Sequence, residues 1–123
     1  MKLLSIAVPC YNSEGYMERC IKTLLKGGDE VEILIVNDGS TKDNTAEIAD
    51  EYAAKYPGQC VAVHKENGGH GDAVMHGLMN ATGLYFKVVD SDDWVDTDAL
   101  KKVLDFLRAH QDDGPDMLVA NYV

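Results

Sequence analysis

Carboxylates cluster directly after an apolar run near residue 90. Asp90, Asp92 and Asp93 follow the run Leu-Tyr-Phe-Lys-Val-Val at positions 84–89. Carboxylates that gather at the end of a buried strand repel one another unless a cation lies between them. Mg²⁺ and Mn²⁺ prefer oxygen ligands and keep positions open for water and substrate phosphates. The Asp90-x-Asp92 pair therefore predicts a divalent-metal site.

Two other interpretations of the acidic cluster can be tested on spacing. A calcium-binding EF-hand loop that starts at Asp90 needs glycine at its sixth position and glutamate at its twelfth. This chain has Val95 and Lys101 there, which excludes an EF-hand. Acidic residues also stabilise the N-terminal end of a helix, and we favour that interpretation for Asp96 and Asp98. For the first pair of aspartates both interpretations stay open.

Three further polar stretches contain residues that suit a nucleotide. Tyr11 follows Pro9 at the end of an apolar run, and an aromatic ring can stack on a base. Asp38 can accept hydrogen bonds from a ribose or from a base N–H. The glycine-rich stretch 67–71 opens a helix, so its backbone N–H groups can approach a phosphate, with His70 beside them. Each stretch alone also fits an ordinary turn, a helix cap or a residue packed on the rim of a sheet.

The segments that must position these residues alternate between short apolar runs and stretches of helical period. This alternation predicts an α/β, Rossmann-like fold with a mostly parallel sheet and helices on both faces. The first helix is expected to bury a face that includes Tyr16. Small residues at Ala73 and Gly77 are expected to let the third helix approach the sheet closely. The expected strands cover residues 3–8, 31–36, 60–64, 84–89 and 117–122, and the expected helices begin near residues 16, 44, 72 and 97.

The loops that follow these strands are expected to meet at one edge of the sheet. Right-handed crossovers place the C-terminal end of every parallel strand at the same edge. Ligands of open α/β sheets bind outside those ends. The loops in question cover residues 9–15, 37–42, 65–71 and 90–96, and they contain all the candidate residues named above. The topology therefore predicts a single ligand site built from four loops.

The composition excludes several classes of partner. Eleven basic and 21 acidic residues among 123 give a formal charge of −10, which argues against nucleic acid and against anionic membranes. A phosphate-bearing ligand therefore needs a cation or backbone N–H groups. Three cysteines without a CxxC pair are typical of a reduced, cytoplasmic protein. No apolar run has the length of a membrane span, so we expect one cytoplasmic domain, 1–123, and leave open a membrane-associated parent protein.

Taken together, the motifs of these loops resemble those of one family. The chain has Val-Pro-Cys-Tyr-Asn at 8–12, Asn-Asp-Gly-Ser-Thr-Lys-Asp-Asn-Thr at 37–45 and Asn-Gly-Gly-His-Gly at 67–71. Ala-Thr-Gly-Leu-Tyr follows at 81–85 and Asp-Ser-Asp-Asp at 90–93. In this order they resemble the N-terminal, nucleotide-sugar-binding part of family 2 glycosyltransferases, which have the GT-A fold.

The resemblance implies an inverting transfer of a sugar from a nucleoside-diphosphate donor to an acceptor hydroxyl, in the synthesis of a cell-envelope polysaccharide. The acceptor would be a glycan or a lipid-linked sugar, and the cofactor Mg²⁺ or Mn²⁺. Tyr11 and Asp38 would contact the base and Asp90 the ribose region, while Asp92, together with Asp90, would hold the metal that bridges the diphosphate. The nucleotide-sugar-binding residues implied in this way are Pro9, Tyr11, Asn12, Asp38, Gly71, Asp90 and Ser91.

The sequence departs from the family pattern at two places. Many members have Ala-Arg-Asn after the glycine loop, whereas this chain has Ala-Val-Met at 73–75, so His70 and Lys65 are the candidate replacements for the basic contact. Full domains of the family also continue well beyond residue 123. We therefore expect a truncated GT-A domain that lacks the acceptor site and the general base, and we assign no catalytic residue.

A domain cut in this way is expected to expose apolar sheet surface and to form a homo-oligomer through it. Two alternatives to a glycosyltransferase remain. One is a non-catalytic binding or assembly fragment. The other is a different nucleotide-binding α/β enzyme, although a dinucleotide-binding oxidoreductase would need a GxGxxG fingerprint that residues 9–15 lack.

Overall fold

One parallel sheet carries the functional loops. The computed structural model describes residues 2–110 and 119–120. Within them the strands lie in the order β3-β2-β1-β4-β5 and every strand pairing is parallel. This confirms the predicted α/β class. The strands are β1 Leu4–Cys10, β2 Val31–Asp38, β3 Cys60–Lys65, β4 Tyr85–Val88 and β5 Val119–Ala120. The helices are α1 Met17–Leu25, α2 Thr45–Lys55, α3 His70–Asn80 and α4 Thr97–His110, with a 3₁₀ turn at Gly28–Glu30.

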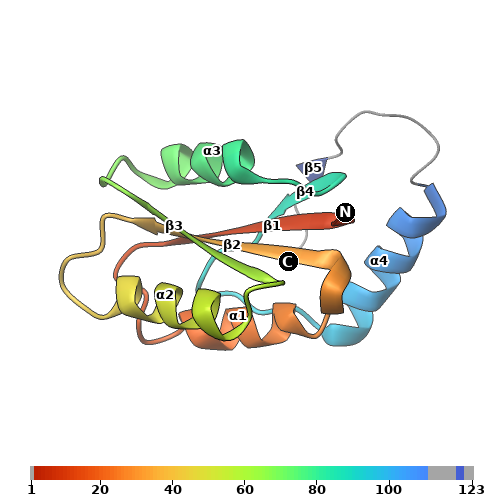
Figure 1. Ribbon diagram of the computed structural model, residues 1–123, viewed down its shortest axis with the longest axis horizontal. Helices are drawn as coiled ribbons and strands as arrows, with labels where there is room; N and C mark the ends of the chain where they lie inside the picture. Colours follow the sequence, from red (N-terminus) through yellow and green to blue (C-terminus); the bar gives the residue numbers. More distant parts are fainter. Residues whose placement is uncertain (1, 111–118, 121–123) are drawn as a thin grey trace.

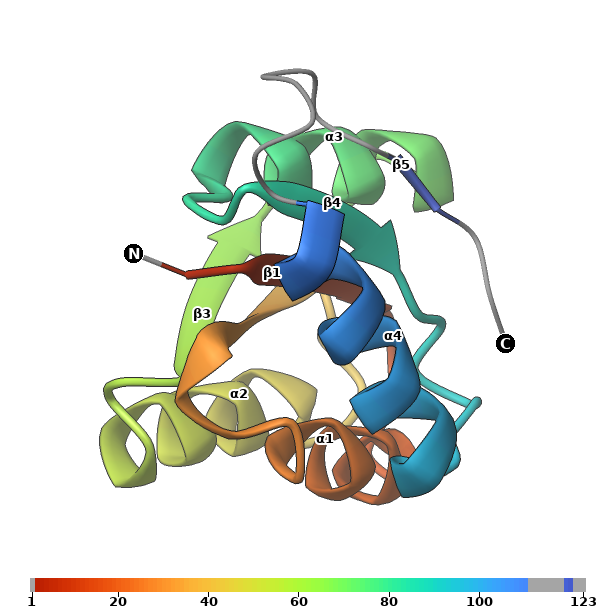
Figure 2. The ribbon, with the colours of Figure 1, turned by 90° about the vertical axis from the view of Figure 1, so that its right-hand side faces the viewer.

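Helices cover both faces of the sheet, as predicted. Figure 1 shows α3 on one face and α1 and α2 on the other, and Figure 2 shows α4 on the same side as α1. Strand β2 is buried on both faces, because Ile33 and Ile35 belong to the large core under α1, α2 and α4. Leu34 and Val36 face the smaller core under α3. Strands buried on both faces read as continuous apolar runs, which is why the strand pattern was clear from the sequence.

Helix α3 lies unusually close to the sheet. A Cβ atom on Gly77 would lie only 2.6 Å from the Cβ of Ala7 on β1. The predicted close approach through small residues is therefore confirmed at this position. It matters for the site because the first turn of α3 contains His70 and follows directly on Gly69, whose φ of 95° suits glycine.

Strands β1 and β2 each continue two residues beyond the prediction, to Cys10 and Asp38. Pro9 therefore lies in a central strand, where its missing N–H would normally cost a ladder hydrogen bond. The carbonyl of Ala7 accepts from Val89 on the β4 side, so the nitrogen of residue 9 points to the same side. The register Ala7↔Val88 would continue with a bond from the N–H of residue 9, which proline lacks, and the pairing of β1 with β4 ends at Val88.

The remaining expectations concern the ends of the chain. The predicted strand at 117–122 is described only at Val119–Ala120, and its other residues lie outside the described part of the chain. Within residues 2–110 and 119–120, none of the helices combines the length and apolarity that crossing a bilayer requires.

Candidate functional site

The candidate site lies where the strand order reverses. Strand β1 pairs with β2 on one side and with β4 on the other, so the connections that leave β1 and β4 diverge. Ligands of such sheets bind in the crevice that this divergence creates. A pocket of about 460 Å³ is present there. Its lining residues are Pro9, Cys10, Tyr11, Ser13, Tyr16, Asp38, Asn67, Gly69, His70, Ala73, Asp90, Ser91 and Asp92.

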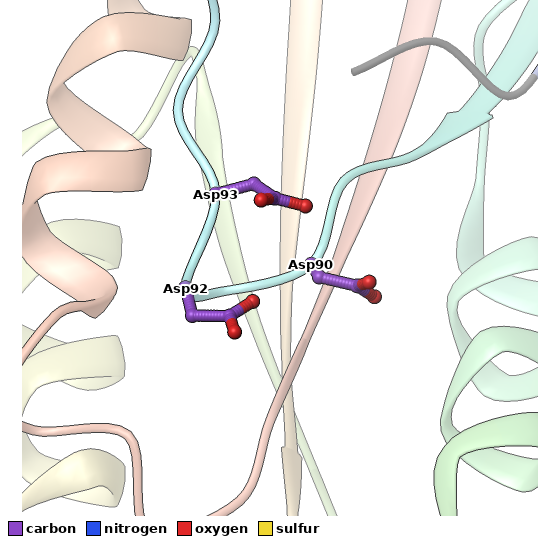
Figure 3. Close-up of side chains that lie close together, drawn as sticks. All are labelled: Asp90, Asp92 and Asp93. Atoms are coloured by element: carbon purple, nitrogen blue, oxygen red, sulfur yellow. The ribbon is translucent and has the colours of Figure 1, made fainter.

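Three carboxylates gather at the β4 side of this pocket. One oxygen from each of Asp90, Asp92 and Asp93 lies within 4.8 Å of the others, and Figure 3 shows the three side chains leaving the loop on the same side. A turn in which the Asp93 amide donates to the Asp90 carbonyl, at 3.0 Å, folds the loop this way. The sequence left the role of Asp93 undecided. Three oxygen donors in this arrangement fit a hard divalent cation.

The other aspartates of this region have a different role, as expected. Asp96 Oδ1 accepts hydrogen bonds from the backbone N–H groups of Asp98, at 2.8 Å, and Ala99, at 3.3 Å. This is the geometry of a helix N-cap, here at the start of α4. Asp98 lies in the first turn of the same helix. The helix-start interpretation of these two residues is confirmed.

His70 brings α3 into contact with the acidic cluster. Its Nε2 lies 2.9 Å from Asp90 Oδ1, and both side chains are more than half exposed. Lys65, the other candidate for the basic contact, is not among the pocket residues. Its Nζ pairs with Asp38 and, at 2.6 Å, with Asp72 Oδ2. Of the two basic side chains considered from the sequence, His70 is the one that lines the pocket.

Asp38 is held by three donors at the β2 side of the pocket. Oδ1 accepts from Lys65 Nζ and from the Gly68 amide, and Oδ2 accepts from the Gly69 amide at 3.0 Å. Burial raises the pKa of this carboxyl, but these hydrogen bonds outweigh burial and hold the pKa below its ordinary value. A carboxylate offers about four acceptor positions. Among the described residues, three positions are used and one on Oδ2 is left for a ligand N–H.

Aromatic side chains contribute the apolar part of the pocket. Tyr11 lines it with 49% of its surface exposed, which leaves a ring face available for stacking. Tyr16 also lines it and is 43% exposed. The prediction that Tyr16 belongs to the buried helix face is wrong, because α1 begins only at Met17 and Tyr16 is its N-cap residue.

Two of the predicted binding residues lie outside the pocket lining. Asn12 instead binds the β2 loop, because its amide donates to Ser40 Oγ at 2.9 Å and its Oδ1 accepts from the Lys42 amide at 3.3 Å. Gly71 is in the first turn of α3, with open space around it. The other predicted residues, Pro9, Tyr11, Asp38, Asp90, Ser91 and Asp92, all line the pocket.

Sequence reasoning did not select Cys10 or Ser13, which also line the pocket. Cys10 ends a buried strand and follows an apolar run, so its residue type gave no sign of a ligand contact. A single serine in a loop carries no signal of its own. Burial raises the pKa of the Cys10 and Cys20 thiols to about 12. Both therefore stay protonated at neutral pH, which excludes a thiolate nucleophile at this site.

Comparison with known proteins identifies the family. The model of glycosyl transferase family 2 matches residues 5–122. The chain belongs to this family. Uncharacterized glycosyltransferase EpsJ of Bacillus subtilis (strain 168) is 38% identical over 110 residues, which cover 89% of this chain and 31% of that protein. Minor teichoic acid biosynthesis protein GgaB of the same organism is 35% identical over 112 residues, which cover 89% of this chain and 12% of that protein.

Solved structures of similar proteins show the same architecture. Residues 1–349 of TarS from S. aureus align with a TM-score of 0.73 and 32% identity, over 89% of this family 2 chain and 33% of that chain. The complex of the same protein with UDP-GlcNAc aligns with a TM-score of 0.71 and 30% identity, over 89% of this chain and 32% of that one. The chain thus spans about a third of the full-length EpsJ and of the TarS structure.

Proposed function

We propose that this family 2 chain is the donor-binding part of an inverting glycosyltransferase and binds a nucleoside-diphosphate sugar together with Mg²⁺ or Mn²⁺. The observation that supports this proposal is the arrangement of one pocket. Its β4 side presents three carboxylates within 4.8 Å of one another. Its β1 and β2 side presents Tyr11 and Asp38. The two sides suit the two ends of a nucleoside diphosphate.

The nucleoside end fits the β1 and β2 side of the pocket. The exposed ring of Tyr11 can stack on a base, a contact worth about 1–3 kcal/mol in known complexes. The acceptor position left on Asp38 Oδ2 can receive a base N–H. Because Lys65 and two amides already fix this carboxylate, it is pre-organised to receive that hydrogen bond.

The diphosphate end needs positive charge, which a chain of formal charge −10 must obtain locally. Asp90, Asp92 and Asp93 would hold a divalent cation at the β4 side, with His70 next to them. The cation would neutralise the charge that develops on the leaving diphosphate. Protein oxygens would occupy part of its coordination shell and leave the remainder to phosphate and water.

Relatives narrow the substrate class. TarS has been crystallised with UDP-GlcNAc and with UDP, and GgaB is a teichoic acid biosynthesis protein. We infer a UDP-sugar donor and a cell-envelope polymer, and an acceptor that is a glycan or a lipid-linked sugar. The acceptor site and the general base would belong to parts of a family 2 enzyme that this chain does not span. Three buried, free cysteines support a reducing, cytoplasmic setting.

Calorimetric titration tests the proposal directly. The 123-residue chain is titrated with UDP-GlcNAc, other UDP sugars and GDP sugars, with and without Mn²⁺. We expect binding heat that depends on the metal. Mn²⁺ is the first choice because it accompanies GDP-Man in a mannosyltransferase from Pyrobaculum calidifontis that shares the fold, with a TM-score of 0.67 at 24% identity over 82% of this chain and 31% of that one.

A matched pair of variants separates the metal site from general charge effects. Asp92→Ala removes a proposed metal ligand, and Asp98→Ala removes the same charge from the first turn of α4. We expect the first variant to lose metal-dependent binding and the second to keep it. Equal binding by Asp92→Ala and the wild type would show that the metal assignment is wrong. The absence of metal-dependent heat with any donor would overturn the proposed function as a whole.

A further inference from the structure

Buried side chains link the loop after β1 to the loop after β2. Thr45, at the start of α2, is fully buried, and its Oγ1 accepts from the Ser13 amide at 2.7 Å while donating to Asp43 Oδ1 at 2.6 Å. Asp43 Oδ2 accepts from the Glu14 amide at 3.0 Å. Two consecutive amides of the β1 loop are thus held by Asp43 of the β2 loop and by Thr45 at the start of α2.

The electrostatics of Asp43 agree with this geometry. Burial raises the pKa of its carboxyl, but hydrogen bonds from the Thr45 hydroxyl and from the amides of Glu14 and Thr45 outweigh burial, so the pKa lies below its ordinary value. The carboxylate is therefore charged at neutral pH. Hydrogen bonds to a charged acceptor are stronger than those to a neutral one, which makes this link between the loops stiff.

The link continues through Ser13 to the acidic loop. Ser13 Oγ lies 3.0 Å from the Ser91 hydroxyl oxygen and also accepts from the Tyr11 amide at 3.0 Å. Ser13 and Ser91 are both buried. Ser91 stands between Asp90 and Asp92, two of the carboxylates proposed to hold the metal. A continuous path of hydrogen bonds therefore runs from the β2 loop to the acidic cluster.

Separate hydrogen bonds from the β2 loop shape the residues on the nucleoside side. Asn12 has a φ of 48°, a backbone conformation that non-glycine residues rarely adopt. Hydrogen bonds with Ser40 and Lys42 of the β2 loop hold it there. Tyr11 lies between Pro9 in the sheet and this constrained residue. Its position depends on the β2 loop, whereas the positions of the carboxylates depend on Ser91.

We propose that Ser13 and Thr45 are positioning residues that couple the nucleoside loop to the metal loop, so that nucleotide and metal bind cooperatively. Neither residue is assigned a contact with the reacting atoms. This inference rests on the proposed function. When either ligand orders an element that both sites share, the two ligands raise each other's affinity by the same factor. That factor falls when the element is cut.

The mechanical part of the proposal is tested without any ligand. Ser13→Ala removes the hydroxyl that contacts Ser91 and keeps the amide that Thr45 holds. We expect NMR amide exchange of Asp93, whose N–H donates to Asp90, to accelerate about fivefold, as the loss of one hydrogen bond of ~1 kcal/mol predicts. Thr41→Val, an exposed position in the β2 loop, is the control. Unchanged exchange in Ser13→Ala would overturn the link.

The cooperative part is tested by titrating Mn²⁺ with and without UDP. In the wild type we expect UDP to tighten Mn²⁺ binding, and Mn²⁺ to tighten UDP binding, by one common factor. Ser13→Ala and Thr45→Val should lower that factor about fivefold. Thr45→Ser keeps a hydroxyl and should restore the factor. If a variant lowers the affinity for each ligand measured alone but keeps the common factor, the substituted residue has only a structural role.

The two measurements separate failure of this inference from failure of the proposed function. If the wild-type chain binds neither UDP nor Mn²⁺, both the proposed function and the cooperative binding are contradicted. The exchange of Asp93 then still decides whether Ser13 links the loops. A wild-type chain that binds both ligands without mutual effect overturns the inference alone.

Discussion

The contact between Gly77 and β1 allows a quantitative test of how α3 is placed beside the site. In Gly77→Ala the new Cβ would lie 2.6 Å from Ala7 Cβ and 3.5 Å from Val36 Cγ2. Carbon atoms normally pack at about 3.5–4.0 Å, so the helix or the strand must move by about 1 Å. Such overpacking costs about 1–3 kcal/mol, against a gain of about 1 kcal/mol in helix propensity. We expect a net destabilisation of about 1 kcal/mol.

Urea denaturation followed by circular dichroism measures this change, and Gly71→Ala is the matched control. Gly71 lies in the same helix, but a Cβ there would meet nothing within 4 Å. The control substitution therefore gains helix propensity without a clash and should stabilise the chain by up to about 1 kcal/mol. The same glycine-to-alanine substitution is thus expected to lower the stability at position 77 and to raise it at position 71. A general effect of alanine cannot produce both results.

A double-mutant cycle assigns the cost to one contact. Ala7→Gly removes the Cβ atom that the alanine at position 77 would meet. The double variant should be about 1–2 kcal/mol more stable than the sum of the two single changes predicts, because neighbouring positions are coupled. If the two changes are additive, or if Gly77→Ala is as stable as Gly71→Ala, α3 does not pack on β1 as described.

Three further predictions concern stability and reactivity. Asp38→Asn should lower the unfolding free energy at pH 7, because a carboxyl with a lowered native pKa stabilises the fold while it is charged. The difference from the wild type should therefore shrink as the pH falls below about 4. A difference that does not depend on pH would contradict this. Cys10 and Cys20, with pKa values raised to about 12, should resist iodoacetamide at pH 8 until the chain is unfolded, and rapid labelling of the native chain would show that they are accessible. Glu32→Gln should lower the unfolding free energy, measured by urea denaturation, by about 1–3 kcal/mol, because the buried carboxylate accepts hydrogen bonds from the amide and the hydroxyl of Thr82. Wild-type stability in this variant would mean that these bonds contribute little.

Parts of the site could be predicted because their residues are close in sequence. Asp90 and Asp92 belong to one short loop after an apolar strand, and the parallel topology indicated that this loop would meet the loops after the other strands. The extension of β1 to Cys10 was not predictable, because proline normally ends a strand. Pro9 fits there because its missing N–H lies on the β4 side, where the pairing of β1 with β4 ends, while pairing with β2 continues to Cys10.

Other parts depend on partners that are distant in sequence. Lys65 fixes Asp38 because β2 and β3 pair in the register that places these two residues side by side. Ser13 and Ser91 are 78 positions apart, yet their hydroxyls meet. Nothing in the residue types marks either contact, since lysine and serine are common in exposed loops.

The sequence by itself determined the fold class, the edge of the sheet where the site lies, and the resemblance to family 2 glycosyltransferases. These follow from hydrophobic period and from motifs within single loops, which are local properties of the chain. The tertiary structure decided which basic side chain lines the pocket, how Asp38 is held, that Asp93 joins the acidic cluster, and how the loops are linked. These depend on strand register, on turn geometry and on the packing of α3 against β1, and each is set by contacts that form only when the whole domain folds.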